Sequence, residues 1–235
     1  MQKKIKIAYD LLTDMTLLES KQVLTLNEIS YLLSGNLSHR YSKSFLGRQY
    51  IYHYYAPMIV SAFNLFGKGA FLELGCGTGT QIIYAKKTGF NLASGIDMVP
   101  DRIRIAQKRS IFHEAHNDTT IEVKDFWKFH PEKRYDAIYS MFAFELFGKT
   151  VSEAGQYLVA LCSPKATIIL DMGNVKRLHK QNYFTDISNE LVKRGFKVRL
   201  EPLFPFLSGT RLAKILGKCN LWPFFRAVRL IATIK

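Results

Sequence analysis

The sequence has few cysteines, little charge and no long apolar run, and each shortage excludes a class of protein. Its 235 residues include three cysteines, Cys76, Cys162 and Cys219, which fit neither zinc-site spacing nor an even set of disulfides. No uninterrupted apolar stretch approaches the length that a membrane span needs. We therefore expect no disulfide scaffold, no metal site and no membrane-spanning protein. Charged residues make up only 22% of the chain and hydrophobic residues 48%, which is ample for a packed core.

The chain also lacks internal repeats, low-complexity tracts and proline-rich linkers, so we expect no second independent domain. Its basic start is similar to that of a signal peptide. However, Asp10, Asp14 and Glu19 interrupt the apolar core that such a peptide needs. We therefore expect a cytoplasmic protein that forms one large α/β domain with an appended N-terminal segment.

The most informative segment is FLELGCGTGT at residues 71–80, where an apolar strand leads into a turn with three alternate glycines. Gly75, Gly77 and Gly79 lack a Cβ atom, so the turn can take positive φ and approach a ligand closely. Glu73 stands just before this turn. A carboxylate at that place disfavours a pyrophosphate and suits a positively charged ligand.

Two further apolar runs end in carboxylates. Residues 92–96 lead into Asp97, and residues 119–123 lead into Lys124 and Asp125. Asp97 follows the glycine turn at about the separation where an acidic residue meets a ribose diol in nucleotide-binding folds. Open α/β sheets bind ligands at these strand ends, so we expect the carboxylates to share one site. The alternative is that they only cap the loops or helices that follow.

The pattern ELGCGTG at residues 73–79 resembles the first motif of the class I S-adenosylmethionine-dependent methyltransferases, and the resemblance extends over roughly residues 70–235. It implies S-adenosylmethionine as cofactor, with Glu73 and the glycine turn, Cys76 included, near the methionine moiety. By its size, we expect Cys76 to pack as a small hydrophobe within the turn. The remaining contacts that the resemblance implies are Asp97 on the ribose, Met98 and Phe126 against the adenine, Asp125 at its amino group, and Ser140 beneath the cofactor.

The alternation of helix and strand patterns predicts an α/β fold, a doubly wound and mostly parallel sheet with helices on both faces. The resemblance adds the seven-stranded, Rossmann-like form with a reversed last strand, which residues 226–235 can supply. We divide the chain into an N-terminal helical segment, residues 1–66, and a cofactor-binding domain, residues 67–235. Within the first, Thr25 and Glu28 predict a capping box that opens a helix ending at Gly35.

Aromatic and basic residues crowd together at residues 39–55. The resemblance implies that the N-terminal helices fold over the cofactor as a lid and form a wall of the acceptor pocket. Such a cover would exclude water from the transfer site. The alternative is that these tyrosines form an amphipathic packing face with their hydroxyl groups in water.

The net charge of +14 is unevenly distributed. Residues 171–235 hold thirteen Lys or Arg against four Asp or Glu, whereas residues 111–170 hold six against eight. The basic part includes residues 205–225, where Trp222 and two phenylalanines follow Arg211, Lys214 and Lys218 at helical spacing. Three interpretations stay open: a solvated surface, peripheral contact with a membrane or lipid-like substrate, and nucleic-acid binding.

We expect a methyltransferase for a small-molecule or lipid-like acceptor, whose pocket the N-terminal helices and residues 205–225 form. An activated sulfonium methyl needs mainly an acceptor held in line behind it. The general base stays unassigned among His39, His53, His113, Tyr139 and Glu145. An RNA methyltransferase and a non-catalytic partner subunit of the same fold are the alternatives, and the sequence does not indicate an oligomeric state.

Overall fold

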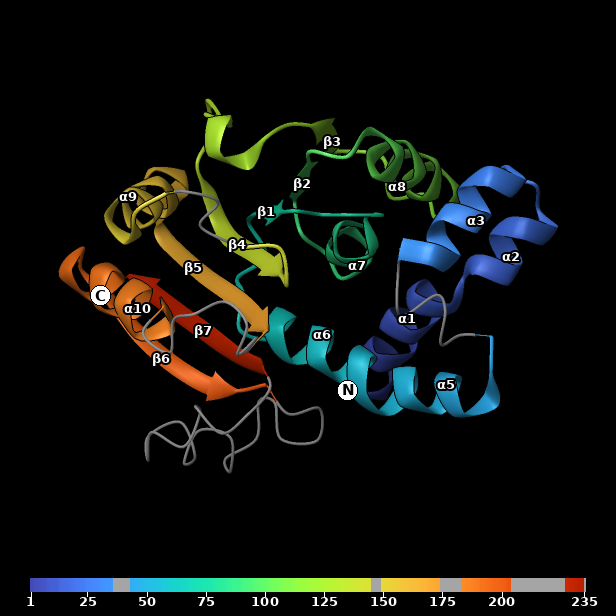
Figure 1. Ribbon diagram of the computed structural model, residues 1–235, viewed down its shortest axis with the longest axis horizontal. Helices are drawn as coiled ribbons and strands as arrows, with labels where there is room; N and C mark the ends of the chain where they lie inside the picture. Colours follow the sequence, from blue (N-terminus) through green and yellow to red (C-terminus); the bar gives the residue numbers. More distant parts are fainter. Residues whose placement is uncertain (36–42, 145–148, 174–182, 204–226, 235) are drawn as a thin grey trace.

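The computed structural model describes residues 1–35, 43–144, 149–173, 183–203 and 227–234. At its centre is a seven-stranded sheet with the order β3-β2-β1-β4-β5-β7-β6 (Figure 1). The strands are β1 (Ala70–Leu74), β2 (Leu92–Asp97), β3 (Thr119–Val123), β4 (Tyr135–Met141), β5 (Cys162–Gly173), β6 (Phe196–Pro202) and β7 (Ala227–Ile234). β1 to β5 are parallel, and β7 runs antiparallel to both β5 and β6. The predicted fold class, including the reversed last strand, is confirmed.

Helices cover both faces of the sheet because successive strand residues point to opposite faces. Phe71 packs in a core with α7 (Thr80–Lys87) and α8 (Pro100–Phe112). The next residue, Leu72, packs in a second core with α9 (Val151–Leu161) and α10 (Tyr183–Lys193). Figure 1 shows the two groups of helices on either side of the sheet. A single 3-10 turn, η2 (Phe126–Lys128), follows β3.

The N-terminal residues form helices that pack on the same side as α7 and α8. They are α1 (Gln2–Thr13), α2 (Met15–Ser20), α3 (Leu26–Gly35), α5 (Phe45–Tyr50), the π-helical turn η1 (Ile51–Tyr55) and α6 (Ala56–Phe63). Side chains of α1 and α6 belong to the same core as β1 and α7, so these helices are an integral layer of the fold (Figure 1). The boundary after residue 66 stays a prediction.

Two local features of the N-terminal helices follow from the sequence. The capping box predicted at α3 is present: Thr25 N–H donates to Glu28 Oε2 (2.8 Å), and Glu28 N–H donates to Thr25 Oγ1 (3.3 Å). α5, η1 and α6 follow one another without a break, and Pro57 has no N–H group to donate within this helix. The N–H of Ala56 reaches back five residues to Ile51 O, which is the hydrogen bond of a π turn.

In the part of the chain that the structure describes, no helix combines the length and the apolar character needed to cross a membrane. The predicted insertion 205–225, with Arg211, Lys214, Lys218 and Trp222, lies outside the described residues, as does Cys219.

Candidate active site

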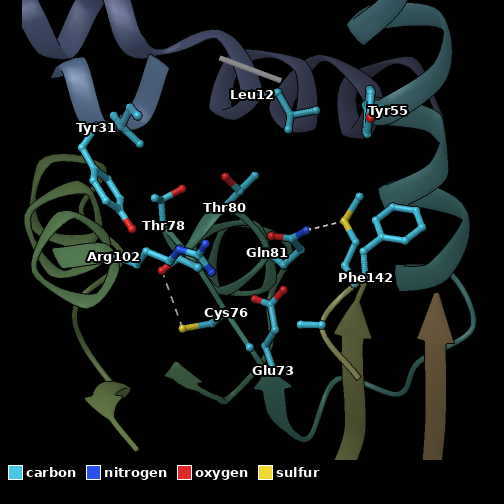
Figure 2. Close-up of a pocket in the computed structure, with 15 residues that line it drawn as sticks. Leu12, Tyr31, Tyr55, Glu73, Cys76, Thr78, Thr80, Gln81, Arg102 and Phe142 are labelled. Atoms are coloured by element: carbon cyan, nitrogen blue, oxygen red, sulfur yellow. Dashed lines mark hydrogen bonds between the residues drawn. The ribbon is translucent and has the colours of Figure 1, made fainter. Parts of the chain in front are cut away.

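A cavity of about 300 Å³ lies where β1 and β4 end (Figure 2). Its floor has two parts: the chain from β1 through the glycine turn into the first turn of α7, and the end of β4 with the two residues after it. The residues of these two parts are Glu73, Gly75, Cys76, Gly77, Thr78, Thr80 and Gln81, and Met141, Phe142 and Ala143. The N-terminal helices add Leu12, Tyr31, Leu32 and Tyr55, and α8 adds Arg102. The N-terminal helices therefore roof the cavity above the glycine turn.

The glycine turn has the backbone that its residue types predict. Gly75, Gly77 and Gly79 have φ of +74°, +53° and +79°, a region that other residues enter only with strain. The N–H groups of Gly75 and Cys76 both donate to Ile96 O (2.8 and 2.9 Å), which fixes the turn to β2. A Cβ atom on Gly75 would overlap the side chain of Ala143, so the turn also packs tightly against the residues after β4.

Glu73 is the buried carboxylate of the cavity. Its side chain is 1% exposed, and among the described residues its Oε2 atom has no hydrogen-bond partner. Burial, and to a lesser extent the neighbouring Asp97, raises the pKa of Glu73 well above its ordinary value. A buried carboxyl oxygen without a partner is costly unless a ligand supplies one. The site therefore fits a positively charged group such as the ammonium of an amino acid, and the resemblance implies the methionine moiety at this place.

Asp97 lies beside the cavity and holds its shape. Its Oδ2 accepts a hydrogen bond from Gly77 N–H (2.9 Å), and its Oδ1 accepts one from Val99 N–H (2.9 Å). The guanidinium of Arg102 is 3.6 Å from Oδ2. Asp97 is 6% exposed and is not itself part of the cavity lining, whereas Met98, the next residue, is 68% exposed.

Asp125 and Phe126 lie apart from the cavity lining. Asp125 Oδ1 accepts a hydrogen bond from Trp127 N–H (3.0 Å), so this carboxylate caps η2, which was the alternative considered from the sequence. The ring of Phe126 packs in an aromatic cluster with Trp127 and Phe144, at centroid distances of 4.8 and 5.9 Å. Their assignment to the adenine stays a prediction.

Two further predicted residues are buried: Ser140 beneath the glycine turn and Cys76 within it. Ser140 is fully buried, and its hydroxyl donates to Leu74 O (2.8 Å), joining β4 to β1 beneath the turn. Cys76 is 4% exposed and packs close to Gly95, and burial raises the pKa of its thiol well above the ordinary value. Of the ten predicted residues, the structure brings four into the cavity lining: Glu73, Gly75, Cys76 and Gly77.

Several residues of the cavity were not assigned a role from the sequence. Gln81 stands in the first turn of α7, and its Nε2 donates to the sulfur of Met141 (2.7 Å). Phe142 has φ of +56°, which is unusual for a bulky residue, and is 45% exposed. Its place just after an apolar strand was the available signal. Leu12 and Tyr31 had none, because only the docking of their helices brings them here (Figure 2).

Among the described candidates for a general base, none lines the cavity. The hydroxyl of Tyr139 is buried and donates to Asp171 Oδ2 (2.7 Å). Burial, and to a lesser extent the charge of Asp171, raises the pKa of Tyr139 well above its ordinary value. His53 contacts Gln49, and His113 contacts Asp14. His39 and Glu145 lie outside the described residues.

Comparison with known proteins gives one family. Residues 71–165 match the family model described as a methyltransferase domain. A search of curated proteins with the sequence found no match. Among solved structures, the chain is similar to the magnesium protoporphyrin IX methyltransferase of Synechocystis PCC 6803 with bound S-adenosylmethionine. The identity is 19%, the TM-score is 0.56, and the match covers 94% of this chain and 97% of the other.

Two further structures show the same fold. The plantazolicin methyltransferase BpumL, in complex with S-adenosylhomocysteine, is 15% identical with a TM-score of 0.56 over 100% of this chain and 99% of its own. The CcbJ methyltransferase of Streptomyces caelestis is 13% identical with a TM-score of 0.59, covering 76% and 94%. The resemblance seen in the sequence is confirmed: residues 71–165 match a methyltransferase domain, and the chain has the fold of S-adenosylmethionine-dependent methyltransferases.

Proposed function

We propose that this methyltransferase acts on a small-molecule or lipid-like acceptor that binds beneath its N-terminal helices. The observation that carries the proposal is the roof of the cavity. Leu12, Leu32 and Tyr55 come from three N-terminal elements and cover the turn that precedes α7. A roofed cavity of about 300 Å³ suits a compact acceptor group better than it suits a folded polymer.

The chain's own residues provide binding, orientation and exclusion of water. S-adenosylmethionine supplies an activated methyl group on its sulfonium. Glu73 would pair with the ammonium of the methionine moiety, and the glycine turn would lie along it. Asp97 would hold the ribose, because its two oxygens already lie beside the turn and each can accept more than one hydrogen bond.

The acceptor side of the cavity is mostly apolar. Met141 ends β4 and Phe142 follows it. Figure 2 shows Leu12 and Tyr55 above Phe142. These side chains exclude water, and the polar groups nearby are the amide of Gln81 and the hydroxyl of Tyr55. An activated sulfonium methyl needs mainly an acceptor held in line behind it, so we infer that positioning by these side chains makes the main contribution to catalysis.

The names of two of the similar solved structures support a small-molecule acceptor. They are named as methyltransferases of magnesium protoporphyrin IX and of plantazolicin. Peripheral contact with a membrane through residues 205–225 stays part of the proposal for a lipid-like acceptor, and that segment lies outside the described residues.

The test is methyl transfer from radiolabelled S-adenosylmethionine to three separate pools: small metabolites, extracted lipids and total RNA. We expect label in the metabolite or lipid pool, and none with the Glu73→Ala variant. Label found in RNA alone would contradict the proposed acceptor class and favour the RNA methyltransferase.

A further inference from the structure

Arg109 is a buried residue of α8 that joins the N-terminal helices to the cavity. Its side chain is 0% exposed. Its Nε and Nη2 groups donate to Asp14 Oδ2 (3.0 and 2.8 Å), and Nη2 also donates to Leu11 O (2.6 Å). Both acceptors stand at the end of α1, on either side of Leu12, which lines the cavity.

The other end of the same guanidinium holds the glycine turn. Its Nη1 group donates to Thr78 O (2.6 Å) and to Thr80 Oγ1 (3.1 Å). The N–H of Gly79, the residue after Thr78, donates to Cys76 O (3.0 Å). The peptide group between Thr78 and Gly79 is therefore fixed at its oxygen and at its nitrogen. A turn with three glycines has high conformational freedom, so it needs such outside contacts to keep a single conformation.

We propose that Arg109 and Asp14 are positioning residues for the cofactor. Arg109 holds the glycine turn in its binding conformation, and Asp14 holds Arg109 only while the end of α1 is docked. The affinity for the cofactor then depends on the N-terminal helices, and the bound cofactor in turn stabilises their docking. This inference rests on the cofactor site of the proposed function and is independent of the acceptor.

A second ion pair of α8 provides a matched control. Glu28 of α3 is 4% exposed, and its carboxylate pairs with Arg104 (3.1 Å) and Lys108 (2.8 Å). These contacts also fix an N-terminal helix to α8. Unlike Arg109, however, Arg104 and Lys108 have no hydrogen bond or ion pair to the glycine turn among the described residues. A change at Glu28 should loosen the helices without acting on Thr78.

The first experiment measures binding of S-adenosylhomocysteine by calorimetry, with urea unfolding of the same samples. Asp14→Asn keeps the shape of the side chain and removes the charge that holds Arg109. We expect Asp14→Asn to weaken binding about tenfold or more, and Glu28→Gln to weaken it by less than about threefold. Asp14→Asn protein that is less stable yet binds with wild-type affinity would reduce the pair to a structural role and overturn the inference.

The second experiment needs no variant, so it decides the question even if Asp14→Asn fails to fold. Hydrogen exchange of the wild-type protein is followed with and without S-adenosylhomocysteine. We expect the ligand to slow exchange at residues 9–20 and to leave α9, on the opposite face of the sheet, unchanged. Equal exchange at residues 9–20 in both samples would overturn the inference. A wild-type protein that binds no S-adenosylhomocysteine would overturn the proposed function as well.

Discussion

Two buried arginines connect the N-terminal helices to the rest of the fold, one through the glycine turn and the other through the sheet. Arg109 joins the end of α1 to the glycine turn. Arg229 of β7 pairs with both oxygens of Asp171 (2.6 and 2.7 Å) and reaches Ser61 Oγ (2.7 Å) and Met58 O (2.9 Å) on α6. Only Arg109 contacts residues that line the cavity, namely Thr78 and Thr80.

The two arginines therefore differ in role. Asp171 contacts the residue that follows β4, because its carbonyl oxygen accepts a hydrogen bond from Phe142 N–H (2.7 Å). Arg229 therefore reaches the cavity-lining residue Phe142 only indirectly, through Asp171 of β5. Changes near Arg109 should alter binding of the cofactor, whereas changes near Arg229 should mainly alter stability.

The largest effect is expected from Arg229→Met. The change leaves Asp171 buried without its cation, and breaking such a pair costs about 3–5 kcal/mol of unfolding free energy. Urea unfolding measures the loss. Replacing Asp171 with Leu in the same protein should recover part of it, because a buried ion pair can be exchanged for apolar residues at low cost. A double variant as unstable as Arg229→Met would contradict this account of the network.

Gly75→Ala tests the contact between the glycine turn and the residues that follow β4. Its positive φ costs a non-glycine residue about 1–2 kcal/mol, and its new methyl group would also overlap Ala143. Gly89→Ala is the matched control, because Gly89 has φ of +91° and open space around it. We expect both variants to lose stability in thermal unfolding, but only Gly75→Ala to bind S-adenosylhomocysteine more weakly. Equal binding by the two variants would contradict the assigned role of the turn.

Glu73→Gln sharpens the assignment of the cofactor end through pH dependence. Burial raises the pKa of Glu73 above its ordinary value near 4.5, so the folded protein holds this proton more tightly than the unfolded chain. The contribution of Glu73 to stability is therefore present below pH 4.5 and is lost as pH rises to the folded pKa, by at most about 1.4 kcal/mol per pH unit.

Glu73→Gln should remove this slope from the unfolding free energy of the ligand-free protein. It should make the protein more stable at pH 8 than the wild type, by about 1–3 kcal/mol. The variant should also bind S-adenosylmethionine more weakly, because the partner of its ammonium is lost. A variant that keeps the wild-type slope would show that another group titrates.

Phe142→Gly should have the smallest effect on stability and should raise the KM for the acceptor. Relief of the positive φ offsets the lost packing and the greater freedom of glycine, so we expect a net change within about 1 kcal/mol. Phe144→Ala, which truncates a side chain 3% exposed in the same loop, should cost about 3–5 kcal/mol. With Phe142→Gly we expect a higher KM for the acceptor and an unchanged affinity for S-adenosylhomocysteine. An unchanged KM would remove Phe142 from the acceptor wall.

The sheet and the glycine turn were predictable because their signals are local. An apolar run, three alternate glycines and Glu73 stand next to one another in the chain, and the alternation of helices and strands predicts a doubly wound sheet. Asp125 shows the limit of this reasoning, because a carboxylate after a strand can cap a turn or contact a ligand, and the sequence pattern is the same in both cases.

The resemblance implied a cover made of N-terminal helices, but the residues that form and anchor this roof could not be predicted, because they depend on contacts between distant segments. In the sequence, Asp14 is visible only as a charge in an apolar stretch, yet in the structure it pairs with Arg109, 95 residues away. Leu12, Tyr31 and Tyr55 belong to amphipathic helices whose pattern indicates a buried face. That pattern does not indicate which part of that face covers the core and which part covers a cavity.

The most direct test of the central claim is calorimetric titration of the wild-type protein with S-adenosylmethionine. The cavity with Glu73 at its floor and the N-terminal helices above it should bind one molecule per chain with affinity in the micromolar range, and Glu73→Gln should weaken that binding. Folded protein that gives no heat with S-adenosylmethionine would contradict the account.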